Sequence, residues 1–346
     1  MEALLDGSPQ QRHFFIEDIS AVADIRRHAV NMAQWLSFDE NREGELAIAV
    51  TEVATNIVKH AARGEVLLRP LHMSDIKAVE IVAIDRGPGF ADFASSARDG
   101  VSTTGTAGTG LGAMRRFADE FDVYSQPGKG SVFYLRIGAN KHSRASPFQI
   151  GAISVAMRGE EVCGDNWGVR IEGDSAIIAV ADGLGHGADA AKASRAVIDA
   201  LGEAQSLSLA RMLEFAHHRA RTTRGSALSL VSLCAGSPFV QSVGVGNIAT
   251  IIYSDGQRRQ MLTHNGIVGH NIRKVQEVVS QWSRDALLIM HSDGLATQWN
   301  LADYPGLGWR HPALIAAILY RDFNRNSDDV TVIVMRNQCV KNQQID

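Results

Sequence analysis

The chain has 346 residues, which at about 150 residues per domain suggests about two domains, each long enough for its own core. Hydrophobic residues make up 45% and charged residues 21%, and 34 Lys and Arg against 38 Asp and Glu give a net charge of −4. This average composition disfavours disorder, collagen and coiled coil. The lack of a dense basic block argues against nucleic acid or a membrane surface as a partner.

Cysteines and hydropathy indicate the compartment. Cys163, Cys234 and Cys339 are far apart, so neither a disulfide framework nor a CxxC metal site can be written. The N-terminus lacks the basic and then apolar order of a secretory signal, and no apolar run approaches the ~20 residues that cross a bilayer. We therefore expect a cytoplasmic protein in a reducing environment.

The first half of the chain begins with strand and helix patterns. A strand is expected at residues 13–17, followed by a helix over residues 19–38 for which Asp18 offers the N-cap. A second helix starts at about Asp39. Two strands follow, at Glu65–Leu71 and Ala78–Ile84.

The second helix combines an apolar face with a polar stripe. Its apolar face is formed by Leu46, Val50, Val53 and Ile57. Glu52, Asn56 and His60 recur at every fourth position on another face. Taken alone, such a stripe is also what the solvent side of an ordinary long helix shows.

Two glycine-rich segments follow. The second strand runs into Asp85-Arg86-Gly87-Pro88-Gly89, which is compatible with a plain turn or with a carboxylate presented to a ligand. Further on, STTGTAGTGLGAM reads as a Gly/Thr-rich loop that opens into a helix, whose first backbone N–H groups suit an anion. The loop matches neither the P-loop nor the dinucleotide fingerprint, so alone it is weak evidence.

Together these three features resemble the GHKL ATP-binding family, which has the Bergerat fold, an α/β sandwich. The resemblance covers residues 12–138 and rests on ELAIAVTEVATNIVKHA, DRGPGF and GTAGTGLGAM. It implies that Asn56 holds a Mg²⁺ bridging the ATP phosphates, that Asp85 accepts a hydrogen bond from the adenine amino group, and that the loop covers the phosphates. The nucleotide-binding residues so implied are Asn56, His60, Asp85, Gly87, Gly89, Gly105, Thr106, Gly108, Thr109, Gly110, Leu111 and Gly112.

Within that family, the short form without a phosphoacceptor helix is similar to the RsbT-type serine kinases and to the anti-sigma factors of bacterial partner-switching modules. This similarity implies that Glu52 is the general base that takes the proton from a protein serine. His60 is compatible with a catalytic role and with one that only orients the helix. Pairing through the ATP domain in this family makes a homodimer an expectation.

The second half of the chain starts after a linker. Periodicity is lost around GANKHSRASPFQ, so we expect an ATP-binding kinase domain at residues 1–140, a linker at 141–147 and a second domain at 148–346. Helices are predicted at Ala188–Gln205, Ser208–Thr222 and His311–Asn324. The β-segments are QIGAISVAMRG, WGVRIEGD, SAIIAVADG, ALSLVSLCAG, FVQSVGVGNIATIIYS, ALLIMHSDG and VTVIVMR.

Aspartates stand at the ends of these β-segments, in the sequences GD, ADGLGHG, SDG and DDVT. Each alone would be a turn or cap residue, but together and in this order they resemble the SpoIIE-type branch of the metal-dependent serine/threonine phosphatases (PPM), RsbX-type proteins in particular. This family implies an α-β-β-α sandwich. Hard carboxylates without clustered Cys or His favour Mg²⁺ or Mn²⁺.

The resemblance also implies roles for single residues. Asp182 bridges two metal ions, Asp165 and the Gly183 carbonyl serve one of them, and Asp293 and Asp328 serve the other, so that a metal-held hydroxide attacks phosphorus. Asp329 is expected to support or cap, although the sequence leaves open which member of the Asp328-Asp329 pair binds metal.

His186 departs from the larger phosphatases of this family. There the catalytic acid histidine directly follows the Asp-Gly pair, whereas here Leu184 follows it and the histidine comes two residues later. We take His186 as the candidate general acid, so the predicted catalytic residues are Glu52, Asp182 and His186.

The two resemblances predict a bifunctional α/β protein with an ATP-dependent serine kinase and a metal-dependent phosphatase. Both would act on STAS-type antagonist proteins in bacterial stress or sigma-factor signalling, with a sigma factor or a downstream phosphatase or cyclase as a further partner. Because the two activities would cycle ATP wastefully, one is expected to be suppressed by a partner, nucleotide or oligomeric state. The alternatives are a nucleotide-gated anti-sigma factor and an ATP-sensing domain that controls an active phosphatase.

Overall fold

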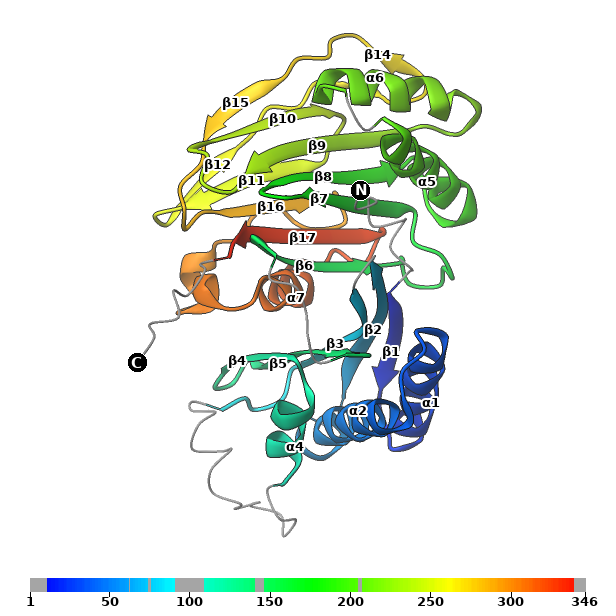
Figure 1. Ribbon diagram of the computed structural model, residues 1–346, viewed down its shortest axis with the longest axis vertical. Helices are drawn as coiled ribbons and strands as arrows, with labels where there is room; N and C mark the ends of the chain where they lie inside the picture. Colours follow the sequence, from blue (N-terminus) through cyan, green and yellow to red (C-terminus); the bar gives the residue numbers. More distant parts are fainter. Residues whose placement is uncertain are drawn as a thin grey trace. The chain divides into compact units, whose positions relative to one another are not determined.

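The computed structural model describes residues 11–61, 63–73, 76–90, 109–140, 146–204 and 207–338, and these fall into two compact units (Figure 1). The N-terminal unit contains the described residues between 11 and 140 together with the short segment 309–318. The C-terminal unit contains residues 146–308 and 319–338, apart from the two undescribed positions. Each unit has its own sheets and helices, and each is described separately below.

The N-terminal unit is a helix layer on an antiparallel sheet. Its described strands pair in the order β1-β2-β3-β5-β4. The strands are β1 (Arg12–Ile16), β2 (Gly64–Met73), β3 (Ile76–Asp85), β4 (Glu120–Gln126) and β5 (Gly130–Gly138), and the helices are α1 (Ser20–Trp35), α2 (Glu40–His60) and α4 (Thr109–Phe117). The apolar face predicted for α2 is confirmed, because Leu46, Val50, Val53 and Ile57 are all buried in one core with the sheet.

The helix starts show where local signals succeed and fail. The predicted start of α2 is confirmed, and Asp39 is its N-cap, since its side chain accepts a hydrogen bond from the Arg42 amide at 2.8 Å. The prediction for α1 was wrong by one residue. Ile19 is the N-cap and already has helical dihedral angles, so Asp18 lies one position too early and accepts from the Ser20 amide instead.

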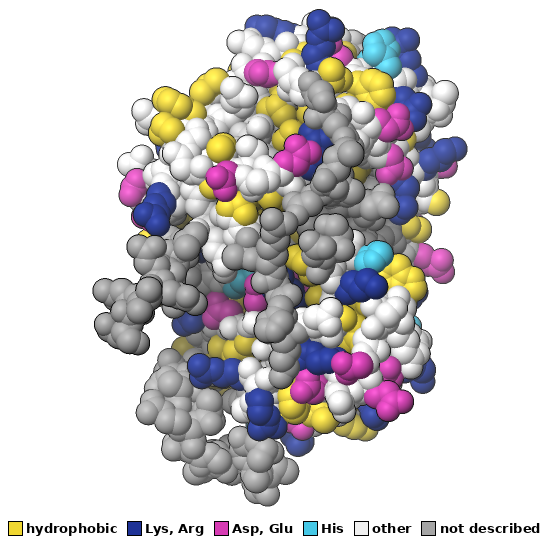
Figure 2. Space-filling view, in the orientation of Figure 1, with side chains coloured by type: hydrophobic (Ala, Val, Ile, Leu, Met, Phe, Trp, Pro, Cys, Tyr) yellow, Lys and Arg dark blue, Asp and Glu magenta, His cyan; other side chains and the backbone are white. Residues whose placement is uncertain are grey.

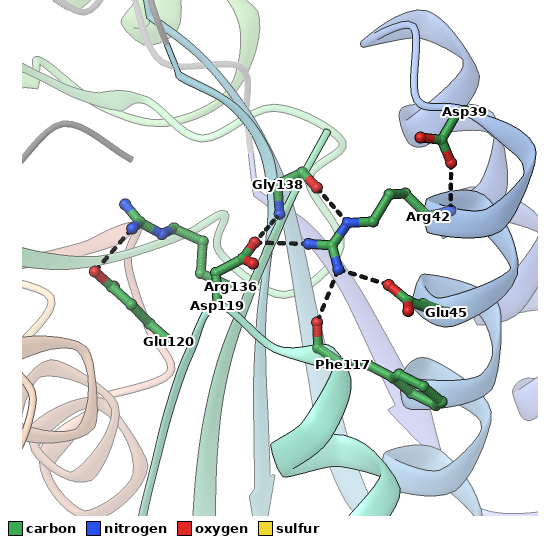
Figure 3. A network of polar contacts seen from close by, with 8 residues as sticks. All are labelled: Asp39, Arg42, Glu45, Phe117, Asp119, Glu120, Arg136 and Gly138. Carbon is green, nitrogen blue, oxygen red and sulfur yellow. Dashed lines mark hydrogen bonds and ion pairs between the residues drawn. The ribbon is translucent and has the colours of Figure 1, made fainter. Parts of the chain in front are cut away.

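A buried arginine joins α2 to residues much later in this unit's sequence (Figure 3). The guanidinium of Arg42, on α2, donates to the carbonyl oxygens of Gly138 at 2.8 Å and Phe117 at 3.2 Å. It also forms ion pairs with Glu45 at 2.6 Å and with Asp119 at 2.7 Å. Asp119 in turn accepts from the Gly138 amide at 2.6 Å. Arg42 therefore ties α2 to the last residue of α4 and to the end of β5.

Replacing Arg42 by Met should destabilise the N-terminal unit by about 3–5 kcal/mol, because the Asp119 carboxylate would stay largely buried without its partner. The measurement is urea unfolding of the full chain, followed by hydrogen exchange of peptides from α2 and α4. Arg27→Ala, which removes an exposed ion pair with Asp24 on α1, serves as the control and should cost at most about 1 kcal/mol. A similar small cost for both variants would contradict this role for Arg42.

The C-terminal unit contains two antiparallel sheets that share one interior. Their described strands pair in the orders β15-β10-β9-β8-β7 and β12-β11-β16-β17-β6. Ser229 on β9 and Thr250 on β11 are buried and hydrogen-bonded at 2.8 Å, which joins the two sheets face to face. The helices α5 and α6 pack on β8 and β9 of the first sheet through residues such as Val197 and Met212.

The bounds of these elements are as follows. The first sheet contains β7 (Asp165–Glu172), β8 (Ser175–Gly183), β9 (Ser226–Cys234), β10 (Phe239–Val245) and β15 (Val278–Gln281). The second contains β6 (Phe148–Val155), β11 (Ala249–Ser254), β12 (Gln257–Gln260), β16 (Leu287–His291) and β17 (Val330–Asn337), and a short hairpin joins β13 (Gly266–Ile267) and β14 (Asn271–Ile272). The helices are α5 (Gly187–Glu203) and α6 (Leu209–Arg219), with a 3₁₀ turn η1 (Ala220–Thr222). The helix α7 (Pro312–Phe323) is divided between the units, because its residues up to Ile318 belong to the N-terminal unit.

The expected two-domain α/β fold class is confirmed, with one local correction. The segment from Phe239 to Ser254 was interpreted as a single β-segment, but it forms β10 and β11, which lie in different sheets. The break falls at Gly246, whose φ of +99° favours glycine and where a Cβ would lie 2.4 Å from that of Ala227. The alternating apolar pattern on both sides of this glycine hid the crossing between sheets.

The surface is mixed in charge. On the face drawn in Figure 2, basic and acidic side chains are interspersed with apolar ones. In the ranges that the structure describes, none of the helices has the length and apolar character needed to span a bilayer.

Candidate active sites

The polar stripe of α2 lies away from the core. Burial of the apolar face leaves Glu52 and Asn56 half-buried and His60 exposed near the C-terminal end of the helix. Within the described residues, neither Glu52 nor Asn56 makes a side-chain hydrogen bond. A half-buried carboxylate and amide without partners among the described residues are well suited to contact a ligand.

Asp85 is held at the end of β3 by the backbone around it. Its Oδ1 atom accepts from the Gly87 amide at 2.7 Å and from the Ser131 amide, on β5, at 3.2 Å. A Cβ at Gly87 would lie 2.9 Å from that of Ala61, so this turn packs against the end of α2. The Asp85 carboxylate is therefore fixed beside the helix that presents Glu52 and Asn56.

The glycines of this turn serve the protein's own packing. At Gly89 the φ is +62°, and a Cβ would lie 2.1 Å from the Gln126 carbonyl oxygen. Gly87 thus lets the turn approach the end of α2, and Gly89 lets it approach the end of β4. Their expected place in a nucleotide site stays a prediction.

The predicted phosphate-covering loop is described only in part. Gly105, Thr106 and Gly108 lie outside the described residues. The backbone of Thr109, Gly110 and Leu111 forms the first turn of α4, and Gly112 is exposed, with nothing within 4 Å of a Cβ placed there. The predicted helix opening is confirmed, and the Arg42 network holds the opposite end of α4.

The predicted phosphatase aspartates come from strand ends of both sheets of the C-terminal unit. Asp165 starts β7 and is the direct register partner of Asp182, near the end of β8. In the other sheet, Asp293 follows β16, and Asp328 directly precedes the Asp329 that leads into β17. A Cβ at Gly183 would lie 2.0 Å from the Ala190 carbonyl oxygen, so this position requires glycine to let α5 approach.

The pKa shifts of these carboxyl groups are those of close, mutually repelling charges. Burial, followed by the charges of Asp293, Asp328 and Asp329, raises the pKa of Asp182 to about 7. Burial and the neighbouring Asp182 also raise the pKa of Asp165 well above its ordinary value. The pKa of Asp293 is raised by burial and by Asp328. These residues therefore form one cluster, in which ionised carboxylates oppose one another.

The donor set of this cluster fits a hard divalent cation. Asp329 accepts from the Met157 amide at 2.8 Å through Oδ1, while its buried Oδ2 has no hydrogen-bond partner of good geometry, which leaves negative charge for a cation to balance. In the described part of the chain, no three His, Cys, Asp or Glu side chains are gathered closely enough to enclose an ion by themselves. Mg²⁺ usually keeps several waters and takes one or two carboxylates, so the set fits when solvent completes it.

Three partners of the cluster were missed by sequence reasoning. Ser292 donates to Asp165 Oδ2 at 2.6 Å and accepts from the Thr331 amide. Asn247, at the crossing between sheets, donates to Asp293 Oδ2 at 2.7 Å. The charge of Arg325 partly offsets the rise in the pKa of Asp293 that burial and Asp328 cause. Ser292 belongs to the SDG sequence, where only the aspartate was assigned a role, whereas Asn247 and Arg325 lie outside the motifs that revealed the aspartates.

His186 has a partner that its motif does not include. Its Nδ1 is hydrogen-bonded to Glu160 Oε1 at 2.6 Å, and its side chain is 55% exposed. It occupies the N-cap position of α5 without a side-chain cap bond. An exposed, carboxylate-held imidazole is able to exchange protons with solvent or substrate, and its role as general acid stays a prediction.

Comparison with known proteins bears on both units. Residues 15–137 match the family of histidine kinase-like ATPase domains, and residues 172–338 match the family of stage II sporulation protein E (SpoIIE). Over 114 residues, 33% of this chain, it is 33% identical to the serine/threonine-protein kinase RsbT of Bacillus subtilis, of which 84% is covered. The anti-sigma F factor of Caldanaerobacter subterraneus is 30% identical over 105 residues, 28% of this chain and 72% of that protein.

The second half has its own relatives. Over 162 residues, 46% of this chain, it is 24% identical to the phosphoserine phosphatase RsbX of B. subtilis, of which 79% is covered. The crystal structure of RsbX in complex with magnesium aligns over 57% of this chain. A chain from the bacterial stressosome, described as a modular system adapted to control secondary messenger signalling, aligns over 55%. RsbX aligns with a TM-score of 0.51 at 22% identity over 98% of its chain, and the stressosome chain with 0.52 at 27% identity over 100%.

Proposed function

Because the chain belongs to the family of the serine/threonine-protein kinase RsbT and joins to it a SpoIIE-type phosphatase domain, we propose that it both adds and removes phosphate on a protein serine or threonine. The substrate is a STAS-type antagonist protein of a bacterial stress or sigma-factor pathway. The protein acts in the cytoplasm, where ATP is available. The kinase comprises residues 1–140 and the phosphatase residues 148–346, on either side of a short linker.

For the kinase, the support is the RsbT relationship together with the half-buried Glu52 and Asn56 on α2, the helix whose end packs against the Asp85 turn. Asp85 would accept a hydrogen bond from the adenine amino group, Asn56 would hold the Mg²⁺ of the nucleotide, and the segment from Gly105 to Gly112 would cover the phosphates. Glu52 takes the proton of the substrate hydroxyl while that oxygen bonds to the γ-phosphorus and the bond to ADP breaks.

For the phosphatase, the observation that supports the proposal best is the cluster of mutually repelling carboxylates at one end of two facing sheets. Asp165, Asp182, Asp293, Asp328 and the Gly183 carbonyl would hold Mg²⁺ or Mn²⁺, the former being the ion of the RsbX complex. Bound cations supply positive charge at the phosphoryl group and lower the pKa of water. His186, oriented by Glu160, would give a proton to the serine oxygen as its bond to phosphorus breaks and a water oxygen bonds to phosphorus in its place.

Two incubations test these activities. The chain with Mg²⁺ and ATP labelled at the γ-phosphate should label a STAS-domain protein, and the chain with Mn²⁺ and without ATP should release phosphate from the phosphorylated form. Absence of phosphate transfer in both directions would contradict the proposal. ATP binding with phosphatase activity alone would instead identify the first domain as a nucleotide sensor.

A second candidate function for the first domain is supported by the 30% identity to an anti-sigma F factor. In that case the domain sequesters a sigma factor in a nucleotide-dependent way, and phosphorylation is secondary. Co-purification of a sigma factor that persists in Glu52→Ala would favour it, whereas loss of substrate labelling in the same variant favours the kinase.

A further inference from the structure

An arginine that no motif includes lies against the loop of the proposed phosphatase site. Arg224 follows η1 and stands two residues before Ser226, the first residue of β9. This segment is bonded to the Asp182 loop on both sides: the Leu184 amide donates to the Gly225 carbonyl at 3.0 Å, and Ser226 Oγ donates to the Asp182 carbonyl at 2.8 Å. The backbone that presents Arg224 is therefore fixed relative to the aspartate expected to bridge the metal ions.

The guanidinium itself lies over the same loop. Its Nη1 atom is 3.4 Å from the position that a Cβ would take at Gly185, where the φ is +85°. Its Nη2 atom pairs with Asp189 Oδ2, in the first turn of α5, at 2.8 Å. The side chain is nevertheless 53% exposed. The Arg224 guanidinium is thus held by the ion pair at one of its edges. Other N–H donors among its five remain accessible to a ligand.

The electrostatic setting calls for such a group. The carboxylate cluster attracts cations, but a phosphoserine side chain approaches with a charge of about −1.5 to −2 and needs positive charge of its own. A guanidinium presents a planar fork that matches two phosphate oxygens. The N-terminal end of α5 lies next to Arg224, because Asp189 in its first turn pairs with the guanidinium. His186 leaves this helix end without a side-chain cap, so the positive end of the helix dipole adds to the charge of Arg224.

We propose that Arg224 binds the phosphoryl group of the phosphatase substrate, with Asp189 holding the guanidinium in place. This inference rests on the proposed phosphatase function and adds to it the residue that recognises the phosphate.

The test uses the full chain with Mn²⁺, para-nitrophenyl phosphate as substrate and inorganic phosphate as product inhibitor. Arg224→Ala should lower kcat/KM about 10- to 100-fold and raise the inhibition constant of phosphate about tenfold, the usual loss for a charged bidentate contact. Arg224→Lys should lie between it and the wild type. The Mn²⁺ concentration for half-maximal activity should stay within about twofold, because Arg224 is no metal ligand.

Two further variants separate binding from bracing. Arg219→Ala removes a surface ion pair with Glu203 of nearly the same exposure and should change each constant by less than about twofold. Asp189→Asn keeps an acceptor for Arg224 but removes a negative charge, so the inhibition constant of phosphate should stay equal or fall. If this inhibition constant rises as much as in Arg224→Ala, the Arg224–Asp189 ion pair only stabilises the local structure and the inference is wrong.

The outcomes also distinguish this inference from its premise. A wild-type chain that hydrolyses no phosphate ester would overturn the phosphatase function and this inference together. An active wild type with an Arg224→Ala variant whose kcat/KM and phosphate inhibition are unchanged would overturn the role of Arg224 alone.

Discussion

Replacing Asp182 by Asn is expected to reduce metal-dependent phosphate release by about 10³-fold or more, since even residues one step outside a metal's ligands typically cost about 10- to 100-fold. The substitution keeps the size of the side chain and removes the charge that faces Asp293, Asp328 and Asp329. The measurement is initial release of phosphate from a phosphorylated STAS-domain protein over a Mn²⁺ titration.

The same hairpin offers a matched control. Asp174 lies in the exposed turn between β7 and β8, at the end opposite to Asp182, so Asp174→Asn should behave as wild type. The initial rate of substrate labelling from ATP should be unchanged in both variants, because the proposed kinase residues are all in the other unit. An Asp182→Asn chain that retains most of its phosphatase activity would rule out the bridging role.

Replacing Glu52 by Gln is expected to lower the rate of ATP-dependent phosphorylation about 10²- to 10⁴-fold, the usual contribution of a general base. Binding of ATP should be unchanged, because the amide keeps the shape of the side chain and the nucleotide contacts are assigned to Asn56 and Asp85. Rapid-quench measurement of single-turnover phosphorylation, with ATP affinity measured in parallel, separates the two effects.

Glu40→Gln, at the exposed first position of the same helix, is the control for lost charge on α2. Equal phosphorylation rates in Glu52→Gln and wild type would contradict the assignment of the base. A loss of ATP affinity as large as the loss of rate would instead make Glu52 a nucleotide-binding residue.

Local patterns in the sequence predicted the elements that position both sites, because periodicity and strand-end chemistry act over a few residues. The buried face of α2 follows from its helical spacing. The four aspartates of the cluster were found because each lies within two residues of the start or end of an apolar strand. The start of α1 was missed by one residue, since the dihedral angles of Ile19, and not the side chain of Asp18, decide where the helix begins.

Contacts between distant parts of the chain could not be predicted in this way. Arg42 and Asp119 are 77 residues apart, and Ser292 and Asp165 are 127 residues apart. Asn247 reaches Asp293 only because the chain changes sheets at Gly246, inside a stretch with an unbroken apolar pattern. Contacts of this kind depend on the tertiary fold, and local patterns in a single sequence do not show which distant residues meet.

A kinase and a phosphatase on one chain have a physical consequence. Each raises the effective concentration of the other at a shared substrate, so a phosphate group added by one is readily removed by the other. Unless one activity is suppressed, the net reaction is hydrolysis of ATP. The steady occupancy of the substrate serine therefore reports the balance between the two proposed sites.

Intact-mass measurement of that occupancy tests the central claim most directly, with one STAS-domain protein, ATP, Mg²⁺ and Mn²⁺, and the wild type compared with Glu52→Gln and Asp182→Asn. The account predicts that Asp182→Asn drives the substrate toward full phosphorylation. It also predicts that Glu52→Gln removes nearly all phosphate from a phosphorylated substrate. With the wild type, the phosphate occupancy should settle between these limits. The same final occupancy with both variants would contradict the presence of two opposing phosphate-transfer sites on this chain.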